Sequence, residues 1–246
     1  MSRMFFTGLL AVSALGAAAA VPAAADRSFS SRLDTDGKSL GPAWSDTTRF
    51  HALTAAGMDD VRVSTGDRWR IRATGDARAL AQLRFLVEDG ALIVGRVSGR
   101  SERYGKARVE VTAPSLRALT AAGSGAVDVD RLGGTRASAT VAGSGRATIG
   151  RVEAERLTAT VAGSGGLGLA GRSVRAELTI AGSGDLAGDG FTAGSANVTM
   201  AGSGDARLRS PGQVRATIVG SGSVTVTGTT ACRQTRMGSG RLLCRP

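Results

Sequence analysis

The chain has 246 residues, of which 42% are hydrophobic and 21% charged, a composition typical of globular proteins rather than of disordered chains. One histidine and two cysteines exclude a multi-histidine metal site, a zinc finger and an iron–sulfur cluster by count alone. The formal net charge of +11 favours anionic partners.

The first 25 residues have the pattern of a secretory signal peptide. Arg3 supplies the positive charge, residues 4–21 form an apolar run, and Ala23-Ala24-Ala25 supplies the small residues of a cleavage site. We therefore expect cleavage after Ala25 and an exported protein, either periplasmic or at the cell surface. No second apolar stretch of about 20 residues follows, so we do not expect the mature chain to span a membrane.

Residues 26–46 are expected to form a flexible leader. Residues 47–115 are expected to form a β-rich region with a less regular pattern. Strands are expected near 49–56, 61–63, 69–72 and 108–112. A short helix is expected over 76–83 with Asp76 as its cap, followed by a hairpin over 85–94 that turns at Asp89-Gly90.

Residues 116–246 contain an internal repeat. The triplet Gly-Ser-Gly recurs every 18 to 20 residues, beginning at Gly123, Gly143, Gly163, Gly182, Gly202, Gly220 and Gly238. Apolar and polar residues alternate on both sides of each triplet, which indicates a strand, a glycine corner and a second strand. A repeat of this length cannot bury its apolar face alone, so successive repeats are expected to stack in parallel around a narrow core.

The sequence therefore predicts an all-β protein, a parallel β-helix with coils of about 20 residues that is continuous with the less regular region before it. The seven triplet glycines are expected at structural corners, because glycine adopts backbone angles that a Cβ forbids.

Several of these segments together resemble one family, the autotransporter-adhesin head GIN domain proteins. The resemblance covers roughly residues 48–230 and is carried by the opening strand 49–56, the strands within 61–72, the hairpin around Asp89-Gly90, and the segment 108–116 that leads into the repeats. It implies a right-handed β-helix, an exported envelope protein and an adhesin-like role, and it offers no catalytic residues.

Arg136, Arg156 and Arg175 each lie seven residues before a triplet, in consecutive repeats. Stacking would align them as a linear stripe that binds anionic envelope polysaccharide or lipid headgroups; the alternative is three solvated side chains. Export argues against nucleic acid as a partner. We expect a non-catalytic binding or structural module of the cell envelope, without metal or cofactor.

An enzyme is the alternative function, namely a carbohydrate-active enzyme of the β-helix type that acts on an anionic polysaccharide. Asp185 and Asp205 share a position in adjacent repeats, and paired carboxylates of this kind serve glycoside hydrolysis. No long loops accompany them to build a cleft, which favours the non-catalytic interpretation.

Cys232 and Cys244 lie six residues before and six after Gly238, both in columns that are otherwise apolar. Both side chains should therefore point into the core of the last repeat. An even cysteine count in an oxidising compartment favours a disulfide, and two buried thiols are the alternative.

Overall fold

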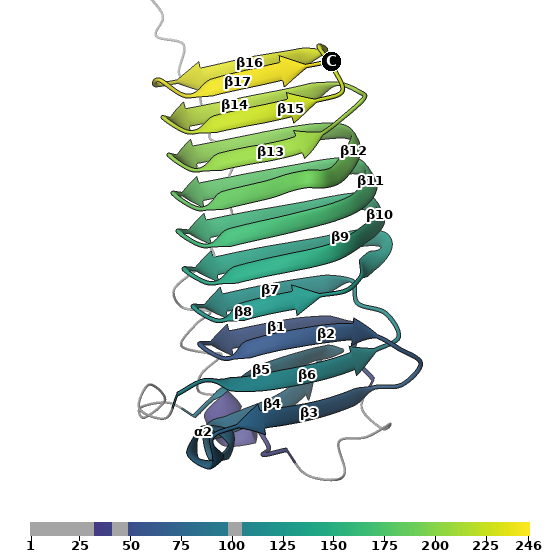
Figure 1. The fold of residues 1–246 in the computed structure, drawn as a ribbon, viewed down its shortest axis with the longest axis vertical. Coiled ribbons are helices and arrows are strands. Elements are labelled where there is room, and N and C mark those ends of the chain that lie inside the picture. The colour runs from purple at the N-terminus through teal and green to yellow at the C-terminus, as the bar shows by residue number, and fades with distance from the viewer. Residues whose placement is uncertain (1–31, 41–48, 98–104) are drawn as a thin grey trace, which may run out of the picture.

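The computed structural model describes residues 32–40, 49–97 and 105–246, and it shows a parallel β-helix of stacked coils (Figure 1). The predicted fold class is confirmed. The predicted signal peptide, residues 1–25, lies outside the described residues.

Each regular coil consists of two strand segments joined by a tight corner, and every segment pairs in parallel with its equivalents above and below. One face is built by β7 (Ala118–Gly123), β9 (Leu132–Gly143), the later parts of β10 (Arg146–Gly163), β11 (Gly166–Gly182) and β12 (Asp185–Gly202), and then β14 (Val214–Gly220) and β16 (Cys232–Met237). The other face is built by β8 (Ala126–Val129), the early parts of β10 to β12, β13 (Asp205–Arg209), β15 (Ser223–Thr227) and β17 (Arg241–Arg245). The tight corners stack along one edge, and β10, β11 and β12 bend around the opposite edge (Figure 1).

The glycine corners combine a special backbone angle with close stacking. Gly163 has φ +112°, and a Cβ added to it would lie 2.6 Å from the carbonyl oxygen of Gly143 in the coil below. That same oxygen accepts hydrogen bonds from the backbone N–H groups of Ser164 (3.0 Å) and Gly165 (2.9 Å). Positive φ angles recur at the first glycine of all seven triplets, Gly123, Gly143, Gly163, Gly182, Gly202, Gly220 and Gly238.

The core is a narrow stack of small and medium apolar side chains. Val141, Val161 and Ile180, for example, lie in register in three successive coils, and each has 0% exposure. Because neighbouring coils repeat the same columns, burial continues along the whole axis, as the alternation in sequence predicts.

The N-terminal part continues the β-helix, but its strands do not stack in the order in which they occur along the chain. β1 (Ala52–Gly57) and β2 (Asp60–Thr65) lie beneath β7 and β8, and they rest in turn on β5 (Ala91–Arg96) and β6 (Ala107–Ala113). β4 (Leu83–Glu88) and β3 (Arg70–Gly75) then add antiparallel to β5 and β6, and they end the stack together with helix α2 (Ala77–Gln82). Both the hairpin and the helix are confirmed, since the Asp76 carboxylate accepts the Arg78 N–H at 2.7 Å.

Part of the predicted leader, residues 32–40, packs against the N-terminal end of the solenoid. Leu33 is only 2% exposed, and Lys38 exchanges two backbone hydrogen bonds of 2.9 Å with Phe85 in β4. Residues 32–40 therefore lie along the edge of β4 that is not paired with β5. The rest of residues 26–46 lies outside the described residues.

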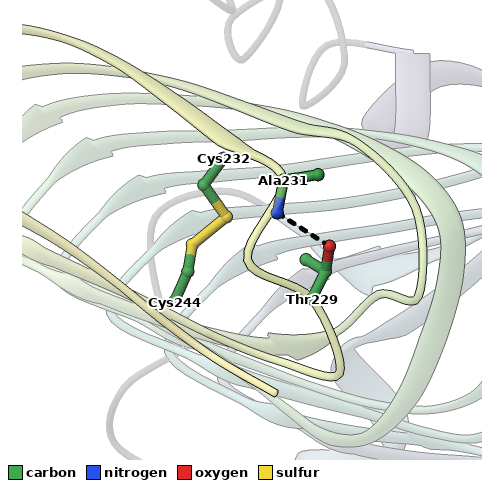
Figure 2. Close-up of a disulfide and its surroundings, with 4 residues drawn as sticks. All are labelled: Thr229, Ala231, Cys232 and Cys244. Atoms are coloured by element: carbon green, nitrogen blue, oxygen red, sulfur yellow. Dashed lines mark hydrogen bonds between the residues drawn. A yellow bond between two sulfur atoms is a disulfide. The ribbon is translucent and has the colours of Figure 1, made fainter.

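The last coil ends in a disulfide between Cys232 of β16 and Cys244 of β17 (Figure 2). The two Cα atoms are 6.6 Å apart, and the cysteines continue the columns of the buried residues Val214 and Val226. Beside the bridge, the Thr229 hydroxyl accepts the Ala231 N–H at 3.0 Å. The bridge therefore links the two faces of the solenoid in the last coil that the structure describes.

Candidate functional site

Three strands bring the predicted arginines together. Arg136 in β9 pairs in register with Arg156 in β10, which pairs in register with Arg175 in β11. Neighbouring strands are about 4.8 Å apart, so the three Cα atoms follow one another up the axis at about this spacing. In water, charges at such a spacing repel by less than about 1 kcal/mol, so the fold tolerates the stripe.

Among the described residues, no ion pair involves Arg136, Arg156 or Arg175. Some arginines on other surfaces do have carboxylate partners: Arg131 and Arg151 both contact Glu153, and Arg207 lies 3.4 Å from Asp189. The stripe is thus a surface where positive charge remains available to a ligand.

A shallow groove of about 390 Å³ runs along the N-terminal part of the stripe. Arg136 and Arg156 line it, and so do His51 and Arg117, which precede β1 and β7. Sequence reasoning missed these two residues because they fall outside the column of the other arginines. A signal was present, since each stands six residues before a corner glycine, Gly57 or Gly123.

The carboxylates of Asp185 and Asp205 hold neighbouring coils together. Asp185 Oδ1 accepts the backbone N–H of Asp205 at 3.0 Å, and Asp205 Oδ1 accepts the Ser223 hydroxyl at 2.8 Å. These bonds give both side chains a structural role, and nothing in their surroundings supports the enzyme alternative.

The described residues contain no group of three or more His, Cys, Asp or Glu side chains placed to hold a metal ion. In the same part of the chain, no helix has the length and apolar character that crossing a membrane requires.

Comparison with known proteins agrees with the fold. The profile of the family described as "Putative auto-transporter adhesin, head GIN domain" matches residues 49–230. No curated protein sequence matches the chain significantly.

Solved structures from two bacterial genera are similar to the chain. A putative adhesin from Bacteroides fragilis superposes with a TM-score of 0.73 at 19% identity, covering 82% of this chain and 94% of that protein. A putative adhesin from Parabacteroides merdae gives a TM-score of 0.65 at 21% identity, covering 81% and 93%. A putative lipid binding protein from Parabacteroides distasonis gives 0.63 at 22% identity, covering 81% and 94%. At these identities the likeness concerns the fold.

Proposed function

Because the chain belongs to the auto-transporter adhesin head GIN domain family, we propose that it is an exported, non-catalytic binding module of the cell envelope. Its ligands are anionic, and the stripe of Arg136, Arg156 and Arg175 holds them. The rigid β-helix serves as the scaffold, because parallel pairing fixes the spacing of the three side chains.

The observation that carries this proposal is the register of the three arginines, which follow one another in consecutive coils. Arg131, Arg151 and Arg207 have carboxylate partners, whereas no described carboxylate forms an ion pair with the stripe. Three aligned guanidinium groups without acidic partners make a surface that attracts and orients anions.

Location in the envelope is supported by the signal-peptide pattern of residues 1–25 and by the adhesin description of the family. Outside the cytoplasm the abundant anions are acidic polysaccharides and lipid headgroups. One structural neighbour is described as a putative lipid binding protein, and lipid headgroups are one of these two classes of anion.

The proposal is tested by comparing the protein without residues 1–25 with two triple variants of equal charge. The first, Arg136→Gln/Arg156→Gln/Arg175→Gln, removes the stripe, and the second, Arg131→Gln/Arg151→Gln/Arg207→Gln, removes paired arginines elsewhere. Binding is measured to vesicles with and without anionic lipid and to acidic and neutral polysaccharides at low salt.

We expect binding to at least one anionic class, no binding to the neutral ones, and a loss only in the stripe variant. Each exposed contact contributes about 0.2–1 kcal/mol, so three together should weaken binding by about 3-fold or more. Equal binding by the two variants, or the same affinity for neutral ligands, would overturn the proposal.

A further inference from the structure

The groove extends the stripe by one coil toward the N-terminus. The Arg117 N–H donates to the His51 carbonyl at 2.7 Å, and the Arg117 carbonyl accepts the Ser138 N–H at 2.9 Å, which fixes the backbone between the strands below and above. A Cβ added to Gly134 would lie 3.5 Å from Cγ and Cδ of Arg117, so the stem of this arginine reaches up over β9. Arg117 therefore joins Arg136 and Arg156 as a third cation of the groove.

Between these cations the groove is lined by small and hydroxylated residues. Ala118 and Ala137 contribute to it, and Ser138 and Thr158 stand two residues after Arg136 and Arg156 in register with each other. The exposed large apolar residues of the described chain, Val174, Val219, Met237 and Leu243, do not line the groove. Guanidinium groups beside hydroxyls on a shallow floor suit the carboxylates and hydroxyls of an acidic sugar chain better than a lipid surface, which favours inserted apolar side chains.

We propose that the groove binds a linear acidic glycan that lies along the solenoid axis and carries one carboxylate per sugar. This inference rests on the proposed function and specifies its ligand. Arg117, Arg136, Arg156 and Arg175 lie on four successive coils, a span of about 14 Å at the usual strand spacing. The rise of an extended sugar residue is close to that spacing, so a chain of about four sugars spans all four arginines.

An acidic side chain limits the site toward the C-terminus. Glu177 pairs in register with Thr158, stands two residues after Arg175, and is exposed without an ion pair among the described residues. Its charge opposes a ligand carboxylate at Arg175. Asn197 occupies the same column one coil further on, so this position tolerates an uncharged amide.

The test uses galacturonate oligomers of one to six sugars, and their methyl-esterified forms, with binding measured by calorimetry at low salt. Affinity is expected to rise with each sugar up to about four and then to level off, and the esters are expected not to bind. Arg117→Gln should lower the affinity for the four-sugar oligomer by about two- to fivefold, and Glu177→Gln should raise that affinity by a similar factor. Arg151→Gln, on a different surface, should leave it unchanged.

Unchanged melting temperatures show that the variants are folded. Affinity independent of chain length, or an unaltered tetramer affinity in both Arg117→Gln and Glu177→Gln, would overturn the glycan proposal. If anionic vesicles still bound in a manner that depended on Arg136, Arg156 and Arg175, the proposed function would stand while this inference failed. If neither the galacturonate oligomers nor the anionic vesicles bound in a manner that depended on these arginines, both the glycan proposal and the proposed function would be rejected.

Discussion

Asp59 and Arg96 form an ion pair inside the N-terminal end of the solenoid, with side chains only 4% and 3% exposed. Arg96 Nε donates to Asp59 Oδ2 at 2.7 Å, and the Ala107 N–H donates to Asp59 Oδ1 at the same distance. Arg96 also donates to the Gly105 carbonyl at 2.6 Å. The pair therefore joins the corner between β1 and β2 to the end of β5 and the start of β6.

The position of Asp59 explains why the carboxylate can be buried there. In the regular coils, the equivalent residue is the second glycine of the triplet, as at Gly125, where a Cβ would lie 2.2 Å from the Asp59 carbonyl. In the coil beneath Asp59, β5 ends at Arg96 and β6 begins at Ala107. A side chain fits at this coil, and the polar groups of Arg96 and Ala107 surround it.

Asp59→Ala is predicted to destabilise the fold strongly, because it leaves the Arg96 guanidinium buried without its counter-charge. Removing one partner of a buried pair costs about 3–5 kcal/mol. Asp189→Ala is the matched control, since it breaks the exposed pair with Arg207 and should cost less than about 1 kcal/mol. Urea unfolding measures the free energy of unfolding of both variants. Equal decreases would show that the buried pair stabilises the fold no more than the exposed pair.

Alanine at the glycine corners is predicted to destabilise the solenoid. Gly163→Ala imposes a Cβ on a positive φ and on the Gly143 carbonyl, with an expected loss of about 1–3 kcal/mol in the free energy of unfolding. Gly165→Ala separates the second cause from the first, because its Cβ would lie 2.4 Å from the Gly145 carbonyl without a positive φ. Ser164→Ala, exposed between them, should change stability by no more than about 0.5 kcal/mol. A neutral result at both glycines would contradict the close stacking of the corners.

Ser173→Ala is predicted to be neutral or to stabilise by up to about 1 kcal/mol. Ser173 is 7% exposed, and its hydroxyl has no hydrogen-bond partner among the described residues. The coils below and above already carry alanine in register, Ala154 and Ala193. Replacing Ser173 with alanine removes a buried hydroxyl whose desolvation is not offset by a hydrogen bond, and it leaves no large cavity. Thermal unfolding measures the change. A decrease of more than about 1 kcal/mol in the free energy of unfolding would mean that the hydroxyl has a hydrogen-bond partner, such as buried water.

The Cys232–Cys244 bridge is predicted to stabilise the last coil. Because it closes a short loop, with a sequence separation of 12, its removal in Cys232→Ser/Cys244→Ser should cost about 3 kcal/mol in the chain-entropy model. Intact mass after alkylation of the protein purified from an oxidising compartment tests the bridge itself. Two alkylated cysteines without reductant would show that the thiols are free.

The repeating part of the fold could be predicted because each coil shows the same local signals. Alternation gives the strands, and the triplet period gives the stacking, so the alignment of Arg136, Arg156 and Arg175 follows from counting alone. The columns also place Cys232 and Cys244 on opposite faces of one coil.

The N-terminal part could not be derived in this way, because its contacts join residues far apart in sequence without a period. Because β1 pairs with β5 and β2 with β6, the coil that comes first in the sequence lies between β5 and β6 on one side and the regular coils on the other. Asp59 and Arg96 are 37 residues apart, and in the regular coils the position of Asp59 is held by a glycine, as at Gly125. His51 and Arg117 enter the groove only because β1 lies beneath β7.

The central claim, that the stripe binds anions through its charge, is tested most directly by the salt dependence of binding to polygalacturonate. The native protein is compared with Arg136→Lys/Arg156→Lys/Arg175→Lys, which keeps the charge, and with the corresponding triple Gln variant, which removes it. Between about 0.01 M and 0.15 M salt the Debye length falls from about 30 to 8 Å, so charge-driven affinity should fall steeply. The account predicts steep and similar slopes for the native protein and the Lys variant, and a shallow slope for the Gln variant. The same slope in all three proteins would contradict it.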